Sequence, residues 1–76
     1  MTNSAEIIID SKNAEILYKA LRVEGERNIP RTSIKIENME NKLKIFINAS
    51  DVNAMRAAIN SYMRWINLSM KLLEMV

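Results

Sequence analysis

The sequence predicts an α+β fold with the order β-α-β-β-α, in which two helices cover one face of a three-stranded antiparallel sheet. Two observations carry this prediction. Two stretches of alternating apolar and polar residues follow each other across a short turn, and segments of helical periodicity stand before and after them. The third strand is expected at the centre of the sheet. With 76 residues, the chain is expected to form a single domain, residues 1–76, with a small core.

The first strand is predicted over residues 5–9, because the stretch AEIII is rich in β-branched side chains. Asp10 and Ser11 then offer oxygen atoms that can cap a helix, which is expected to span residues 12–24. Gly25 is the only glycine of the chain and lies where a left-handed C-cap is expected.

The two middle strands are predicted over residues 31–38, RTSIKIEN, and residues 42–49, KLKIFINA, with MENK as the hairpin turn between them. Pro30 ends a loop over residues 26–30 and suits the first position of a strand. The side chains predicted to face the helices are Ile34, Ile36, Leu43, Ile45 and Ile47.

The last helix is predicted to follow a cap at Ser50 or Asp51 and to run from Val52 towards the C-terminus. At about 100° per residue its side chains form two apolar rows, centred about 120° apart, and one polar row. The first apolar row comprises Val52, Met55, Ile59, Tyr62, Met63, Ile66, Met70 and Leu73. The second comprises Ala54, Ala58, Ser61, Trp65, Leu68, Leu72 and Met75. The polar row comprises Asn53, Arg56, Asn60, Arg64, Asn67, Lys71 and Glu74.

These two rows give the last helix about twice the apolar width that packing on a sheet requires. One explanation is that the second row packs on the other helix of the same domain. The other explanation is that its late members, Leu68, Leu72 and Met75, meet another protein, because they would otherwise form a conspicuous patch on a small chain. The chain has no cysteine and no histidine, so disulfides and nearly all zinc sites are excluded as stabilising devices, and association with a partner remains.

The strand predicted over residues 31–38 is expected to form an edge of the sheet. Exposed edges invite pairing with another chain, and a two-fold dimer joining equivalent edges would make one six-stranded sheet. The alternative is a short edge that Lys35 and Glu37 protect and that stays monomeric.

The composition argues against an enzyme. A chain with one glycine has no phosphate-binding loop or dinucleotide fingerprint, and without cysteine or histidine it lacks the commonest nucleophile and base. No catalytic, cofactor-binding or metal-ligating residue is therefore predicted, and no small-molecule substrate. The sequence shows neither a signal peptide nor an apolar run of bilayer length, so no membrane association is expected and the protein is expected to be cytoplasmic.

The polar row of the last helix presents Arg56, Arg64 and Lys71 among asparagines. These cations could hold RNA phosphates, form salt bridges with a partner protein, or simply be solvated. A net charge of +2 does not decide between these uses, and the sequence contains no signature of the common RNA-binding modules.

The segment LKIFINASDVNAMRAAINSYMRWINLS, residues 43–69, resembles the small dimerisation subunit of the KEOPS (EKC) complex, the Pcc family. That family typically shows a strand that ends in an alanine and an acidic cap, followed by a helix with the pattern R-A-x-x-N-S and a further aromatic or aliphatic position. The matching residues here are Ala49, Asp51, Arg56, Ala57, Asn60, Ser61 and Trp65. The short length and the β-α-β-β-α order agree with the same family.

The resemblance implies an archaeal-type subunit that does no chemistry. It implies a homodimer formed through the sheet, or a pair with a paralogue in place of the second copy. It also implies that the helices dock on the N-terminal lobe of the threonylcarbamoyltransferase, which modifies the adenosine beside the anticodon of ANN-decoding tRNAs. Through the assembled complex, such a subunit can help to receive tRNA.

Site residues follow from the faces of the elements together with this resemblance. The predicted transferase-binding surface comprises Leu17, Leu21, Ala58, Ser61, Trp65, Leu68 and Leu72. The predicted dimer edge comprises Thr32, Ile34, Ile36 and Asn38. Arg56, Asn60, Arg64 and Lys71 are predicted to contact tRNA or to fix the helix pair. Two other functions stay open: a stand-alone RNA-binding module, and a transcription-linked adaptor that engages proteins through the same helix.

Overall fold

The computed structural model describes residues 3–25 and 30–74, and it confirms the predicted β-α-β-β-α order. The elements are β1 (Asn3–Asp10), α1 (Ala14–Gly25), β2 (Thr32–Met39), β3 (Lys42–Ala49) and α2 (Val52–Glu74). Most of the loop predicted at residues 26–30 lies outside the described residues, and so does Met75 of the second apolar row.

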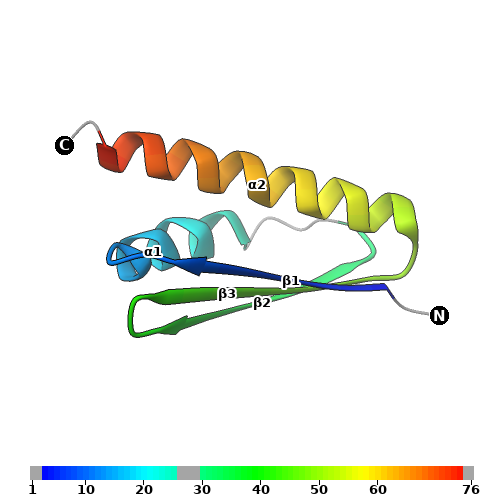
Figure 1. Cartoon of the computed structure of the whole chain (residues 1–76). Coiled ribbons are helices and arrows are strands. Elements are labelled where there is room, and N and C mark those ends of the chain that lie inside the picture. The colour runs from blue at the N-terminus through cyan, green and yellow to red at the C-terminus, as the bar shows by residue number, and fades with distance from the viewer. Residues whose placement is uncertain (1–2, 26–29, 75–76) are drawn as a thin grey trace.

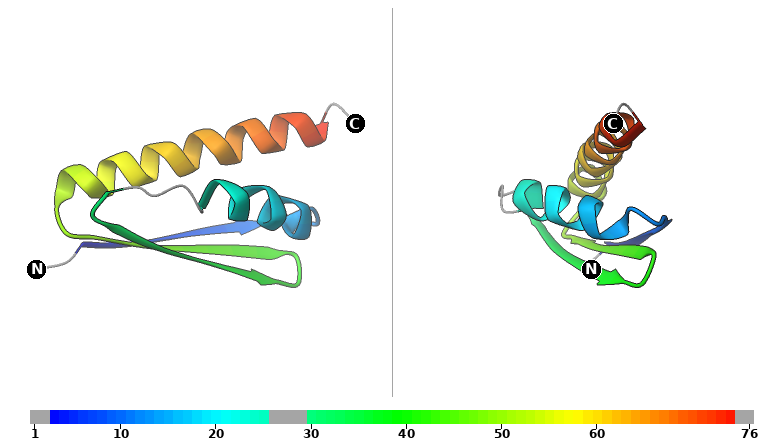
Figure 2. Two further views of the ribbon diagram at one scale, coloured as in Figure 1. Left: turned by 180° about the vertical axis from the view of Figure 1, so that it is seen from behind. Right: turned by 90° about the vertical axis from the view of Figure 1, so that its left-hand side faces the viewer.

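The sheet has the strand order β1-β3-β2, so the third strand lies in the centre as predicted. Both pairings are antiparallel, and at mid-sheet Ile45 of β3 stands opposite Ile7 of β1 and Ile36 of β2. Figures 1 and 2 show both helices on the same face of this sheet, with the other face bare.

The core forms where the alternating residues of β3 meet the helices. Leu43, Ile45 and Ile47 have no exposed surface, because the central strand is paired on both edges and covered on one face. From the helices, the core receives Ala14, Leu17, Leu21, Ala54, Met55, Ala58, Tyr62 and Ile66. The described residues include no buried charged side chain, so the interior is held by apolar packing.

The two helices share the covered face unequally. The N-terminal half of α2 lies over the sheet, whereas its C-terminal half stands away from the strands, and α1 occupies the wedge between them (Figures 1 and 2). The long helix of 23 residues therefore packs first on strands and then on α1. This arrangement decides which of its apolar side chains are covered.

Side-chain oxygens accept hydrogen bonds at the start of both helices, but only α2 has its N-cap residue bonded in this way. The Asp51 carboxylate accepts a hydrogen bond from the N–H of Ala54 at 2.8 Å, so Asp51 rather than Ser50 is the N-cap of α2. At α1, the Ser11 hydroxyl accepts from the N–H of Asn13 at 3.1 Å, and the helix begins at Ala14, two residues later than predicted.

The far end of α1 differs from the prediction as well. Gly25 is its last helical residue, and no glycine in the described part of the chain has a positive φ. The left-handed cap predicted at this residue is therefore wrong: the helix continues through the glycine instead of ending before it.

Arg31 joins the ends of three elements. Its carbonyl accepts a hydrogen bond from the N–H of Ser50 at 3.0 Å, and its guanidinium lies 2.7 Å from the Asp51 carboxylate. Its φ of 60° is uncommon for a residue with a β-carbon. This conformation connects the start of β2 with the end of β3 and the cap of α2.

At the opposite end of the sheet, Asn41 has a φ of 54° in the hairpin turn, and its carbonyl accepts from the N–H of Ser11 at 2.8 Å.

We expect Asp51→Ala to lower the free energy of unfolding by about 1 kcal/mol, because an unsatisfied N-cap donor of α2 is exposed and the contact with Arg31 is lost. Asp51→Asn is the matched control. It keeps an acceptor oxygen for Ala54 and removes only the charge of a largely exposed ion pair, so it should lose much less stability. Urea denaturation of the three chains checks this, and equal losses for both variants would contradict the capping role.

Candidate protein-interaction surfaces

An apolar groove lies between α1 and the C-terminal part of α2. It encloses about 190 Å³ and is lined by Ile16, Leu17, Ala20, Ser69, Leu72 and Leu73. One turn of α1 supplies the first three residues and one turn of α2 the others, so the groove follows from the way the two helices pack. A single hydroxyl group is its only side-chain polar atom.

Two residues that line this groove are exposed, Ile16 at 54% and Leu72 at 57%. Leu68, one turn before Leu72 on α2, is 56% exposed and extends the apolar surface beyond the groove. Trp65, one turn before Leu68 on the same side of α2, is half-buried, and its ring makes an edge contact with Tyr62 at 5.0 Å between centroids. This surface is apolar and concave, and it presents no charged or catalytic side chain. It therefore suits contact with an apolar ridge of another protein.

The structure divides the predicted transferase-binding surface into two groups. Leu17, Leu21 and Ala58 have no exposed surface, and they hold the helix pair and the sheet together. The prediction that they lie on an outer surface is therefore wrong, because periodicity does not report which side of an apolar row the neighbouring helix covers. Ser61, Trp65, Leu68 and Leu72 are the members with exposed or partly exposed side chains.

The buried stripe of α2 runs between its two apolar rows and not along one of them. Met55 and Tyr62 of the first row are buried together with Ala54 and Ala58 of the second. The outer margin of each row stays exposed. In the second row this margin comprises Leu68 and Leu72, and in the first row it comprises Val52, Met63 and Met70.

Two features of these surfaces were missed at the level of sequence. Ile16 belongs to the groove but was not assigned to it, although a row of Ile16 and Ala20 along α1 was a detectable signal. The second exposed margin, on the side of Met63, was not predicted as a separate surface. Its exposure follows from the tilt of α2, which periodicity does not report.

The polar row of α2 faces away from the domain. Arg56, Asn60, Arg64 and Lys71 are all exposed, and no hydrogen bond or ion pair joins their side chains to other described residues. The alternative that they fix the helix pair is therefore not supported within this chain. Glu74, in the same row, is the only acidic residue of α2, so the row carries three cations and one acid.

The predicted dimer edge is an edge of the sheet. β2, which contains Thr32, Ile34, Ile36 and Asn38, pairs with β3 on one side, and the described residues provide no strand on its other side. Ile34 and Ile36 are partly buried against the core. On the opposite, helix-free face, Lys35 and Glu37 form an ion pair at 3.2 Å.

The helix-free face mixes apolar and charged groups. Ile8 and Met39 are about half exposed, and Phe46 is half-buried at the centre. Around them, three lysines balance three acids: Lys35, Lys42, Lys44, Glu6, Asp10 and Glu37. A face with balanced charge gives no general attraction for a polyanion.

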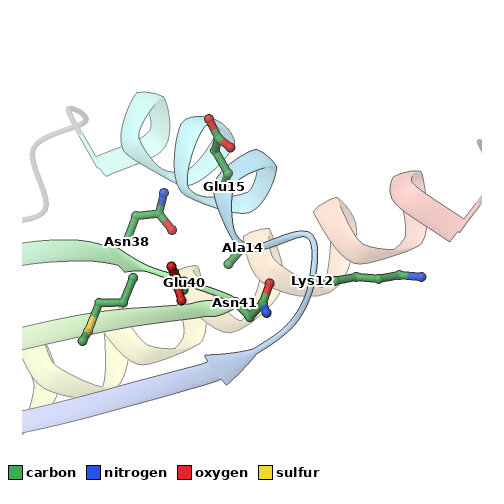
Figure 3. A pocket seen from close by; sticks show the side chains of 7 residues that line it. Lys12, Ala14, Glu15, Asn38, Glu40 and Asn41 are labelled. Carbon is green, nitrogen blue, oxygen red and sulfur yellow. The ribbon is translucent and has the colours of Figure 1, made fainter.

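A polar hollow at the turn end of the sheet has a volume of about 440 Å³. Figure 3 shows its side chains between the start of α1 and the β2–β3 turn, with Lys12 extending away from the others. Its polar residues are exposed or belong to turns, and neither of its acids, Glu15 and Glu40, is buried. The described residues also contain no group of three potential metal ligands and no helix suited to crossing a membrane.

Comparison with known proteins gives one result at the level of families. The family model described as "Transcription factor Pcc1" matches residues 3–74 and thus includes every strand and helix. A search of curated proteins found no match.

We expect Leu68→Ala to change the free energy of unfolding by less than about 0.5 kcal/mol, because its side chain is already largely in water. Leu17→Ala, the same chemical change at a residue with no exposed surface, should cost about 2–5 kcal/mol by opening a cavity between α1 and β3. Thermal and urea denaturation measure both effects. A large loss for Leu68→Ala in a dilute, monomeric sample would contradict its place on the surface.

Proposed function

The chain belongs to the Pcc1 family, and on that premise we propose that it is the small, non-catalytic assembly subunit of a KEOPS-type complex. Two copies, or one copy and a paralogue, pair through their sheets. Each chain docks its helices on the N-terminal lobe of the threonylcarbamoyltransferase, which modifies the adenosine next to the anticodon of ANN-decoding tRNAs. The subunit acts in the cytoplasm, binds no cofactor and contributes surfaces instead of chemistry.

The observation that carries this proposal is the apolar groove between α1 and α2. Ile16 and Leu72, which line it, and Leu68, one turn before Leu72, are each more than half exposed. Burying such a side chain contributes about 1.5–3 kcal/mol, so a partner that covers the groove gains enough to offset a substantial part of the cost of association.

The described residues leave this groove open. α1 lies between the sheet and the C-terminal half of α2, and the residues of both helices at the groove keep exposed side chains. Two helices in contact present parallel ridges and a channel between them, which accepts a helix of another protein. A transferase lobe that offers one or two helices therefore fits this surface.

The test is co-purification of the chain with the candidate transferase. We expect Leu68→Asp to abolish capture, because it places a carboxylate in the apolar contact, while the dimer of the small subunit persists. Asn67→Asp is the matched control: it adds the same charge one residue away, on the polar face of α2, and should leave capture intact.

Two outcomes would contradict the proposal. Undiminished capture of Leu68→Asp would show that the groove is not the docking surface. Loss of every interaction with Arg64→Glu alone would transfer the function to the cationic face and favour an RNA-binding module.

The cationic polar row of α2 supports RNA contact as a second candidate function. Arg56, Arg64 and Lys71 could each meet one phosphate, with a positioning rather than a sequence-reading role. In the complex, such contacts would add to those made by the transferase.

We expect the chain on its own to bind tRNA weakly. Three cations neutralise at most about three phosphates, so log K should fall with log salt with a slope of about −2 to −3 per chain. Filter binding at several salt concentrations, with Arg64→Glu as the variant, measures this. Tight binding at physiological salt without any partner would favour a stand-alone RNA-binding module.

A further inference from the structure

We infer that the groove between α1 and α2 contains a hole for one side chain. This hole receives a large apolar residue, of the size of leucine or phenylalanine, from a helix of the transferase that carries acidic residues beside its apolar ridge. Ala20 and Ser69 determine this specificity, because their small side chains leave the space that the incoming residue fills. The inference rests on the proposed function and adds the chemistry of the partner helix at the docking site.

The hole arises from the order of large and small residues on the two helices. α1 and α2 run in opposite directions, and one turn of each lines the groove (Figures 1 and 2). In the α1 turn Ile16 comes first and Ala20 last. In the α2 turn Ser69 comes first and Leu73 last. Opposite directions therefore bring the two large residues together at one end and the two small residues together at the other, where space is left.

The volume and the lining indicate what fits. The groove encloses about 190 Å³, and a closed apolar cavity of about 150 Å³ already holds a benzene ring. Its floor contains Leu17, which is fully buried, and Leu73, which is partly buried, so an entering side chain meets packed hydrocarbon. The Ser69 hydroxyl is the only polar side-chain group of the lining, and a charged residue would find no counter-charge there. The hole therefore selects one large apolar side chain.

The hole is accessible to an incoming helix. Ala20 is exposed and Ser69 is partly exposed, and the walls on either side, Ile16 and Leu72, are more than half exposed. Four residues that surround a hole in this way are the usual seat for a single large side chain of a packed helix. A helix that lies along the channel between α1 and α2 brings one such side chain to the hole.

Charge favours acidic residues beside the apolar ridge of that helix. Arg64 lies one turn before Leu68 and Lys71 one turn after it, both on the outer side of the apolar surface. Glu74, the only acid of α2, lines a different hollow, beside the loop from β1 to α1. On α1, an exposed ion pair at 3.7 Å adds no net charge. The α2 side of the surface therefore attracts acids and repels a basic helix.

The test fills the hole without removing apolar surface. Ala20→Leu places a larger apolar side chain over Leu17, at an exposed position where leucine is a good helix former. The urea midpoint of the chain alone should stay the same or rise, because the filler adds apolar contacts. Co-purification with the candidate transferase should nevertheless weaken by about tenfold or more, because the partner side chain then overfills the space. A surface that binds by apolar area alone would capture the transferase as well or better.

Three further variants serve as controls. Asn67→Leu adds the same side chain on the polar face of α2, outside the groove, and should leave capture unchanged. Ser69→Ala removes the hydroxyl but keeps the space, so capture should persist or strengthen. Ser69→Leu fills the hole from the other helix and should reproduce the loss, which keeps the test decisive if Ala20→Leu fails to fold. Circular dichroism establishes the folding of each chain.

The acidic character of the partner helix has its own test. Lys71→Glu should weaken capture several-fold, because it sets like charges against each other. Raising the salt from about 0.1 M to about 1 M should weaken capture of the unmodified chain more than that of this variant. Arg56→Glu is the matched control, since it makes the same reversal of charge at the other end of α2 and should leave capture unchanged.

The outcomes separate the hole from the docking itself. If Leu68→Asp abolishes capture and Ala20→Leu does not, docking stands and the hole is overturned. If neither substitution affects capture, the proposed docking surface fails and this inference with it. If Ala20→Leu converts a dimer of the chain alone to a monomer, the hole holds a residue of the second copy, and the inference is overturned. Stronger capture by Lys71→Glu would overturn the acidic character of the partner helix.

Discussion

The structure depends on one buried face of the three-stranded sheet, which both helices have to cover. The inner side chains of the central strand, Leu43, Ile45 and Ile47, are fully buried, and every core residue of the helices packs towards them. A sheet of this width has room for one helix along its length and only a short second one. α1, with 12 residues, fills the remaining space and lifts the C-terminal half of α2 away from the strands.

The exposed apolar surface follows from this sharing. A helix that lay flat on the sheet would bury one stripe and present polar groups elsewhere. α2 instead buries a stripe between its two apolar rows, first on β3 and then on α1, and leaves an apolar margin on each side. The groove beside Leu72 is therefore a product of the packing geometry, and it explains why a small chain carries more apolar side chains than its own core can use.

The sheet creates a different kind of free surface. Its bare edges offer main-chain groups, which attract any strand, and charge decides which strand fits. On the helix-free face β2 carries Lys35 and Glu37, which form an ion pair, whereas the charged residues of β1 on that face are Glu6 and Asp10. The ion pair between Arg31 and Asp51 holds one end of β2 against the start of α2, so the edge available for pairing and the helix available for docking are set by one junction.

Local patterns in the sequence determined the order of the elements, the central position of the third strand and the alternation that buries β3, because periodicity and strand connection depend on neighbouring residues. They also identified α2 as a helix with too much apolar width, and Asp51 as one of two possible caps. Only the tertiary structure decided which edge of each apolar row is covered: Leu17, Leu21 and Ala58 were expected outside and are buried, while Ile16 and Met63 are exposed. The reason is physical, because the tilt of α2 over α1 results from fitting two helices of unequal length on three strands, and no short window of residues contains that constraint.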